Sequence, residues 1–484
     1  MPNRSHPPAL ATLFFVEMWE RFSYYGMRAL LTLFMVAPIG AGGFGFATAD
    51  AAVFYGNYTM AVYLLAIPGG YIADHAIGAR RSVMIGGIII ATGHFTLALP
   101  TLASFYIGLI LIALGTGLFK PNISVLVGSI YHRGDPRRDA GFSLFYMGIN
   151  IGAFIAPLVT GFLAQSATFK SWLVTAGFDP NKSWHWGFAA AGVGMTIAVI
   201  VFARRHGEFR GPDAAPIARD GNWSRGAGVL LGSAALLSIL LLSDRPEFTW
   251  FRYIVIALPL AAIAIFARAE DLDARRIAAI FVFFLAAMVF WSAFEQAGLT
   301  IALFADRLTD NQIGGWTIPS AWYQALNPLF VIVLAPAFAA LWTGLGPRQP
   351  ATPFKFVAGL VLLSFSFFLM VPAAHLTAAG RVSPLWLIAL FFLQTLGELC
   401  LSPVGLSTMT RLAPPRFVGL MLGVWFLASA FGNKLAGILG TDFKSDDAGE
   451  LGRFFAGLGA LVLATGALLF FISPWLRRLM GDER

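Results

Sequence analysis

Residues 102–131 read LASFYIGLILIALGTGLFKPNISVLVGSIY, an apolar run that carries one charged residue, Lys120. A helix needs about 20 apolar residues to cross the hydrocarbon core of a bilayer, so this stretch is long enough. The strands of membrane β-barrels are shorter and alternate in hydrophobicity, which this continuous run does not do. The stretch therefore predicts a membrane-spanning α-helix with a lysine inside it.

The rest of the 484-residue chain has the same character. Hydrophobic residues make up 58% of it and charged residues only 12%, whereas a soluble domain has about 25% charged residues. Apolar runs predict fourteen spanning helices, over residues 11–38, 48–74, 80–100, 102–131, 139–164, 186–203, 227–243, 252–268, 277–305, 319–343, 354–373, 383–410, 416–440 and 453–476. We therefore expect an all-α membrane protein.

The basic residues report the orientation of these helices. Most of the 33 Lys and Arg residues fall on one side of the predicted spans, and the positive-inside rule then makes both termini cytoplasmic. They do not form a stripe with interleaved aromatic residues, which disfavours nucleic-acid binding. The first apolar stretch contains Glu17, Glu20 and Arg21 and lacks a cleavage site, so we expect a mature helix rather than a signal peptide.

A basic connection at residues 204–225 divides the chain after the sixth predicted span. The next two spans, 227–243 and 252–268, contain no internal charge and no polar cluster, and are expected to face lipid. Without them, six spans precede the break and six follow it, which is typical of the major facilitator architecture. We expect an N-terminal six-helix bundle at 1–204, a linker with two extra helices at 205–276, and a C-terminal six-helix bundle at 277–484.

Charged residues inside spans are candidates for function, because each costs roughly 2.5–3.5 kcal/mol at mid-membrane. Glu17, Arg21, Tyr24 and Arg28 recur at helical spacing and should share one face. A neighbouring like charge, as between Glu17 and Glu20, and desolvation both favour a protonated carboxyl, so the face predicts a proton-dependent switch. The alternative is that these charges only pair to hold helices together. The full set is Glu17, Glu20, Arg21, Arg28, Lys120, Glu295, Glu398 and Lys434.

Two further polar residues in the spans favour structural roles. Lys434 lies near the outer end of its predicted helix, from which a lysine can extend to the interface. His94 is expected to be a packed or interfacial histidine rather than a proton carrier.

Six motifs carry a resemblance to known transporters. GGYIADHAIGARRS (69–82) resembles the loop signature of major facilitator proteins, in which Gly70 and Gly78 would allow close helix approach and a tight turn, and Asp74 would act in gating. EMWERFSYYG (17–26) matches the ExxERFxYYG signature of the proton-dependent oligopeptide transporter family. Four further stretches of this chain resemble other segments of that family, in order: FYMGINIGAFIAP (145–157), FWSAFEQAG (290–298), QALNPLF (324–330) and GELCLSPVGLS (397–407).

This resemblance covers essentially the whole chain and implies a bacterial symporter that imports di- and tripeptides with protons by alternating access. It implies proton coupling by Glu17, Glu20, Arg21, Lys120 and Glu295, and gating by Asp74 and the pairs Arg28–Glu295 and Lys120–Glu398. Gly56 stands where animal members carry a histidine, so coupling would depend on carboxylates. The implied substrate-binding residues are Tyr24, Tyr25, Arg28, Tyr63, Lys120, Asn150, Trp291, Glu295, Asn327, Glu398, Ser402 and Trp425.

Other classes of function find less support. The sequence has no GxSxG, HExxH or His/Cys grouping, which disfavours an enzyme and a metal site, and no filter repeat, which disfavours a channel. The single cysteine, Cys400, excludes an intramolecular disulfide. The alternative within the carriers is another small solute, such as nitrate or a different zwitterion. We expect no cofactor besides the coupling proton, and a monomer in the bacterial inner membrane.

Overall fold

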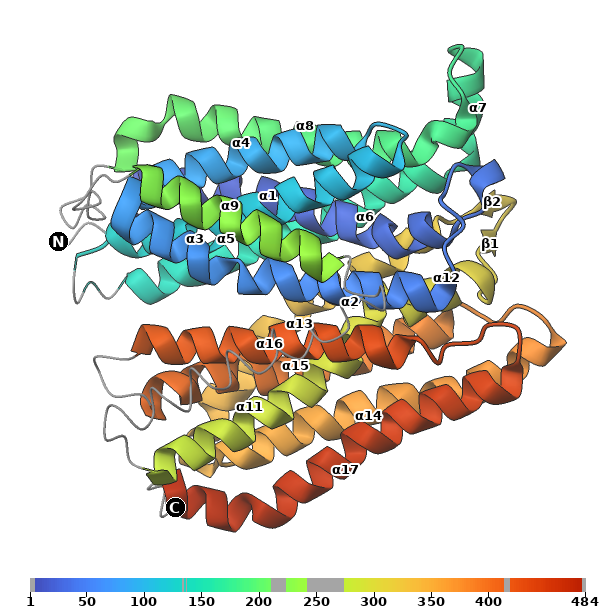
Figure 1. Ribbon diagram of the computed structural model, residues 1–484. Helices are drawn as coiled ribbons and strands as arrows, with labels where there is room; N and C mark the ends of the chain where they lie inside the picture. Colours follow the sequence, from blue (N-terminus) through green and yellow to red (C-terminus); the bar gives the residue numbers. More distant parts are fainter. Residues whose placement is uncertain are drawn as a thin grey trace. The chain divides into compact units, whose positions relative to one another are not determined.

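The computed structural model describes residues 5–132, 135, 137–209, 223–241, 274–412 and 418–480, and this part of the chain is mostly helical (Figure 1). Nine of the described helices are long and apolar enough to cross a membrane. The helices are α1 (Pro8–Val36), α2 (Thr48–Leu64), α3 (Ala66–Ile72), α4 (Ala79–Leu97), α5 (Leu102–Ser129), α6 (Arg138–Gln165), α7 (Ala167–Thr175), α8 (Ser183–Arg204), α9 (Trp223–Leu241), α11 (Ala274–Phe294), α12 (Thr300–Arg307), α13 (Leu326–Leu345), α14 (Thr352–Leu376), α15 (Leu385–Leu412), α16 (Val418–Gly440) and α17 (Ala448–Met480).

Thirteen of the fourteen predicted spans overlap these helices, and the remaining one, 252–268, lies outside the described residues. Two spans are interrupted. The 48–74 span breaks between α2 and α3 and ends in a π-helical turn, η2 (Ala73–Ile77), whereas the 277–305 span breaks at the 3₁₀ turn η6 (Glu295–Gly298). Irregular turns inside helices often mark functional sites.

The helices form two compact units, and each is described here by itself. Unit 1 comprises Met1–Phe46, Ala61–Ser238 and Asn311–Ile332; unit 2 comprises Ala47–Met60, Ile239–Asp310 and Val333–Arg484. Each unit therefore includes a short segment from the opposite half of the sequence. Unit 2 takes the first part of α2, and unit 1 takes the start of α13 with the hairpin of β1 (Gln312–Ile313) and β2 (Trp316–Thr317).

Small residues let helices approach closely in unit 1. A Cβ atom on Gly93 of α4 would lie 2.8 Å from the carbonyl oxygen of Gly108 on α5, and one on Gly86 would lie 2.7 Å from that of Gly115. Such contacts are typical of membrane helix pairs, which gain little from the hydrophobic effect. Around them, apolar side chains of α1, α4, α5, α6 and α8 form one buried cluster.

The loop signature shows where the chain needs glycine. Gly78 has φ 80° and ψ 153° and precedes α4, as the predicted tight turn requires. The prediction of close approach at Gly70 is wrong, because a Cβ atom there would meet nothing within 4 Å. The close contact belongs to Gly69, whose Cβ would lie 1.9 Å from the carbonyl oxygen of Gly117, since the two neighbours point in different directions on α3.

Unit 2 is built by the same kind of packing. A Cβ atom on Gly359 of α14 would lie 2.8 Å from the carbonyl oxygen of Gly397 on α15. The Ser364 hydroxyl of α14 donates a 2.8 Å hydrogen bond to the carbonyl oxygen of Gly459 on α17. These contacts bury backbone against backbone, so the core of unit 2 is closely packed.

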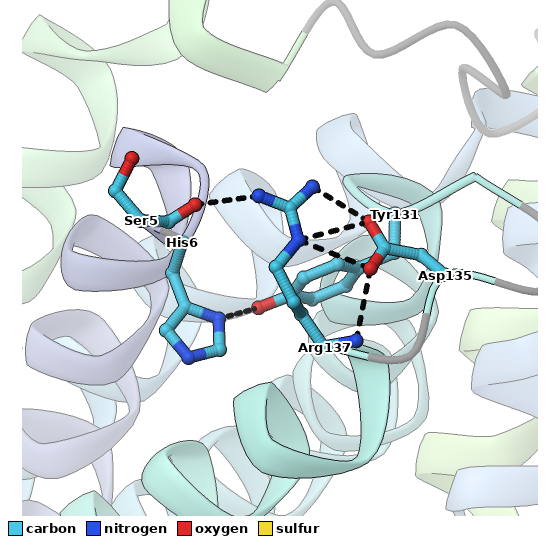
Figure 2. A network of polar contacts seen from close by, with 5 residues as sticks. All are labelled: Ser5, His6, Tyr131, Asp135 and Arg137. Atoms are coloured by element: carbon cyan, nitrogen blue, oxygen red, sulfur yellow. Dashed lines mark hydrogen bonds and ion pairs between the residues drawn. The ribbon is translucent and has the colours of Figure 1, made fainter. Parts of the chain in front are cut away.

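A polar network fastens the chain before α1 to the α5–α6 connection (Figure 2). The Arg137 guanidinium donates to both carboxylate oxygens of Asp135, and its Nη1 donates to the carbonyl oxygen of Ser5 at 2.6 Å. The His6 Nδ1 lies 2.9 Å from the Tyr131 hydroxyl. Hydrogen bonding to Arg137 holds the pKa of Asp135 at about 2, below its ordinary 3.8. Asp135 is therefore ionised at neutral pH.

The segment 311–332 is held to α6 within unit 1. The indole Nε1 of Trp322 donates to the carbonyl oxygen of Leu158 at 2.9 Å, and the amide of Gln165 donates to the Ser320 hydroxyl at 2.8 Å. The backbone N–H of Ala321 donates to the side-chain oxygen of Gln165 at 3.0 Å. Three polar contacts thus join sequence-distant parts of the chain.

Candidate functional site

The predicted face of α1 contains a buried cluster of opposite charges. The Arg21 Nε lies 3.3 Å from Glu17 Oε1, one helical turn earlier, and also donates to Glu20 Oε2. All three side chains are at most 4% exposed. Burial in low dielectric strengthens their attraction, so the pairing is strong only while both carboxylates and the guanidinium keep their charges.

The cluster has unused hydrogen-bonding capacity. Among the described residues, Glu17 Oε2, Glu20 Oε1 and Arg21 Nη2 are buried without a hydrogen-bond partner. Buried polar atoms are nearly always satisfied in proteins, so orphaned atoms call for an explanation such as a bound proton, a water or a ligand. Here two acceptors and one donor are left over in one place, which suits a group that gains and loses a proton.

Aromatic rings flank the cations of unit 1. The Arg21 Cζ lies 5.3 Å from the ring centroid of Tyr24, and the Arg28 Cζ lies 5.9 Å from that of Tyr25. The Lys120 Nζ on α5 lies 4.2 Å from the ring centroid of Tyr63 on α2. Ring faces attract cations, and each of these three positive charges lies beside a tyrosine ring.

The remaining predicted residues of unit 1 have different surroundings. Asn150 is buried on α6, and its amide donates to the carbonyl oxygen of Tyr146 one turn earlier. Asn327, at the start of α13, is half-buried and belongs to unit 1 although it lies in the second half of the sequence. Asp74 is exposed in η2. The predicted set therefore extends from the core of the unit to its surface.

The predicted residues of unit 2 are Glu295, Trp291, Glu398, Ser402 and Trp425. Glu295 is buried at the point where α11 gives way to η6, one turn after Trp291. Glu398 and Ser402 are half-buried and one turn apart on α15. Trp425 on α16 is buried, with its ring centroid 6.2 Å from that of Phe356. The α-helix thus changes to a 3₁₀ turn at a buried acidic side chain, and irregular turns inside helices often mark functional sites.

The Lys434 side chain does not extend to the interface, which the sequence had left open as one structural role for it. The residue is buried on α16, and its ammonium donates to Oδ1 of Asn57 on α2 within unit 2. The Asn57 amide donates in turn to the carbonyl oxygen of Leu240 on α9, at 3.4 Å. The contact is compatible with the structural role favoured for Lys434, but the sequence gives no sign that Asn57 is its partner.

Gly56 lies next to this contact and has no room for a side chain. A Cβ atom there would lie 2.8 Å from the Cα atom of Gly437 and 2.9 Å from the carbonyl oxygen of Asn433. Any larger residue, including the histidine of animal members, would push α2 away from α16 in this arrangement. The predicted dependence on carboxylates is therefore compatible with the packing at this position.

Two other predictions concern histidine and metals. His94 is fully buried on α4, as expected of a packed histidine. Within the described ranges, no three His, Cys, Asp or Glu residues are placed to hold a metal ion.

Comparison with known proteins gives a consistent result. A family model described as "POT family" matches residues 80–453. A Yersinia enterocolitica protein named "Peptide transporter YePEPT" is 41% identical, over 99% of this chain and 96% of that protein. An Escherichia coli protein named "Dipeptide and tripeptide permease A" is 30% identical, over 99% of this chain and 94% of that protein.

Solved structures agree in fold as well as in sequence. A mutant of peptide transporter POT in complex with alafosfalin has a TM-score of 0.87 and 37% identity, covering 99% of this chain and 97% of that one. A POT family transporter in complex with 5-aminolevulinic acid has a TM-score of 0.85 and 30% identity, with 97% of each chain covered. The all-α major facilitator fold is thereby confirmed, and the chain belongs to the POT family of membrane transporters, the proton-dependent oligopeptide transporters.

Proposed function

We propose that this protein imports di- and tripeptides together with protons by alternating access. The observation that carries the proposal is the buried Glu17–Glu20–Arg21 cluster, with its orphaned carboxylate and guanidinium atoms. Protonation of a carboxylate there would weaken its hold on Arg21, which lies on the same helix, and would leave the guanidinium to attract another anion. The proton and the positive charge that Arg21 presents to other groups would thus depend on one another, as coupling requires.

The substrate proposal is supported by complementary charge. A peptide presents a carboxylate at one end and an ammonium at the other. The cations of unit 1, Arg28 and Lys120, suit the carboxylate, whereas the acids of unit 2, Glu398 and Glu295, suit the ammonium. Tyr24, Tyr25, Tyr63, Trp291 and Trp425 supply aromatic area that accepts side chains of many shapes. Asn150, Asn327 and Ser402 supply hydrogen-bonding groups, and relatives of this chain are named as peptide transporters.

The same proposal includes two charge pairs as gates. Arg28–Glu295 would join the halves on the outer side, Lys120–Glu398 would join them on the inner side, and Asp74 would stabilise the closed cytoplasmic loop. The halves are the bundles 1–204 and 277–484, linked by 205–276. We further propose an inner-membrane location with cytoplasmic termini and function as a monomer, although a relative at 27% identity and TM-score 0.79 is described as tetrameric.

A second candidate substrate is a zwitterion other than a peptide. A transporter 30% identical to this chain is described in complex with 5-aminolevulinic acid, which has an amine and a carboxylate but no peptide bond. The opposite charges proposed for peptide termini would serve such a molecule equally well.

Liposome uptake separates these candidates. The purified protein is reconstituted, labelled dialanine is supplied outside, and uptake is measured with an inward proton gradient and with the gradient collapsed. We expect accumulation that requires the gradient and that unlabelled di- and tripeptides suppress, but nitrate does not. Suppression by 5-aminolevulinic acid alone, without any peptide uptake, would move the assignment to the second candidate.

A further inference from the structure

Helix α7 is a short amphipathic element between two spanning helices. It begins directly after α6, where the Ser166 hydroxyl accepts a 3.4 Å hydrogen bond from the backbone N–H of Phe169. The chain then reaches α8 through a single 3₁₀ turn, Pro180–Lys182. Both neighbours span the membrane, so α7 is confined to the bilayer surface where they end. In Figure 1 it runs across the direction of α6 and α8 and projects beyond α8.

The two faces of α7 differ in polarity. Phe169, Trp172, Leu173 and Ala176 follow the spacing i, i+3, i+4, i+7, which aligns them on one side of a helix. Thr168, Ser171 and Thr175 lie on the opposite side by the same geometry. Leu173 is fully buried in unit 1, whereas the Trp172 side chain beside it is 52% exposed. The buried leucine fixes the rotation of the helix, and the tryptophan extends past the protein on the same side.

Aromatic rings connect α7 to the end of α8. The rings of Phe169 and Trp172 stack with centroids 5.4 Å apart. The Trp186 ring on α8 lies 6.1 Å from Phe169 and 6.5 Å from Trp172, and the Phe178 ring lies 5.4 Å from Trp186. Trp186 is in the first turn of α8, so the cluster lies at the depth where this span meets the membrane surface.

We propose that α7 is an interfacial anchor, with Phe169, Trp172, Phe178 and Trp186 seated among the lipid headgroups of the leaflet opposite to the N-terminus of the chain. Tryptophan and other aromatic side chains collect at this level because one part of the ring is apolar and another can stay wet. An amphipathic helix with such a face lies in the plane of the interface. The occupant is lipid, because the cluster is continuous with spanning helices that lipid already surrounds.

The anchor has a mechanical consequence for unit 1. It ties one end of α6 and α8 to a fixed depth in the bilayer, so that these two helices resist displacement along the membrane normal. Hydrogen bonds from Trp322 and Gln165 connect α6 to the segment 311–332, and the same depth is imposed on that segment.

Spin labels attached to single cysteines test the proposal in the full-length protein. Cys400 is the only cysteine and is buried, so C400S gives a background for the variants Trp172→Cys and Phe178→Cys. Each labelled protein is reconstituted into vesicles of phosphatidylcholine and phosphatidylglycerol, and its collisions with oxygen and with a water-soluble nickel chelate are measured. Oxygen partitions into lipid and the chelate does not.

Matched controls sit on the same helix. Ser171→Cys and Val174→Cys replace exposed residues that lie off the aromatic face, and Leu468→Cys on the spanning helix α17 gives a lipid reference. We expect the ratio of oxygen to chelate collisions at 172 and 178 to lie below that at 468 but clearly above that at 171 and 174. Equal access of the chelate to labels at 171, 172, 174 and 178 would overturn the proposal. Labels at 172 and 178 shielded from both reagents would overturn it too, and would indicate a protein partner.

Discussion

Two lysines on spanning helices, one in each unit, are held in different ways. Lys120 of unit 1 is half-buried, with its Nζ 4.2 Å from the centre of the Tyr63 ring. Lys434 of unit 2 is almost completely buried and donates a hydrogen bond to Asn57. A ring face holds a cation by weak, non-directional attraction, whereas an amide oxygen fixes the position of the donor.

Charged residues in membranes can be ranked by their burial and by the contacts that hold them. Intramembrane charge alone marks both lysines as functional candidates. The partial exposure of Lys120 leaves it accessible to a substrate carboxylate or a second acid. The burial of Lys434 and its bond to a neighbouring helix instead suit the packing of α2 on α16. We therefore expect substitutions of the two lysines to have effects on different properties.

Replacement of Lys120 should have the largest effect. Lys120→Ala removes a cation that the proposed mechanism uses both for the peptide carboxylate and for closing the inner side. We expect loss of gradient-driven dialanine uptake and also of counterflow in liposomes. The matched variant Lys434→Met should retain both activities in correctly folded protein. Equal loss in the two variants would break the distinction between the lysines.

Lys434→Met should lower the stability of the fold and leave proton-coupled uptake intact. The substitution leaves the buried Asn57 Oδ1 without this donor, and an unsatisfied buried acceptor costs about 1–3 kcal/mol. Thermal unfolding in detergent should therefore occur at a lower temperature than in the native protein. The second variant, Asn57→Leu with Lys434→Met, removes both partners and should recover part of the loss. An unchanged melting temperature for Lys434→Met would show that the hydrogen bond contributes little.

Gly56→Ala tests the same helix contact from the other side. The new Cβ atom would meet backbone atoms of α16 at less than 3.0 Å, and overpacking of this kind costs about 1–3 kcal/mol. Gly70→Ala is the control, because a Cβ atom there meets nothing within 4 Å. We expect a lower melting temperature for Gly56→Ala only. A matching decrease in Gly70→Ala would show that loss of helix glycine, and not separation of α2 from α16, is responsible.

The smallest effect is expected at the half-buried pair of Asp135 and Arg137 in the α5–α6 connection. The pKa of Asp135 is lowered to about 2, so its ionised form stabilises the fold above the ordinary value of 3.8, and this contribution is lost only as the pH falls towards 2. Between about pH 5 and 8 the pair is fully formed. Asp135→Asn should therefore leave the midpoint of the uptake–pH profile unchanged. A shifted midpoint would assign part of the proton dependence to this loop.

Much of the architecture follows from local sequence patterns. Apolar runs predicted the spans because each must present about 20 apolar residues to lipid, whatever its neighbours are. Helical spacing also placed Glu17 and Arg21 on one face, and their 3.3 Å ion pair confirms this. These features depend on residues that are close in the chain, and periodicity is informative there.

Features that depend on distant residues were missed. The Lys434–Asn57 hydrogen bond joins residues 377 positions apart, and no pattern in either segment indicates the other. The close contact at Gly69 was assigned to Gly70, because the loop motif does not fix which glycine points towards α5. Helix α7 was missed because its nine residues are too few for a span. Its aromatic and polar residues nevertheless recur at helical spacing.

In this mechanism proton coupling depends on the buried carboxylates of α1, and Glu20→Gln removes one of them. The variant is reconstituted beside the native protein, and dialanine accumulation under an inward proton gradient is compared with gradient-free counterflow. We predict that accumulation is lost, because glutamine cannot exchange a proton, while counterflow persists at a reduced rate. Full accumulation at acidic pH in Glu20→Gln would contradict a coupling role for Glu20 and move the proton site elsewhere.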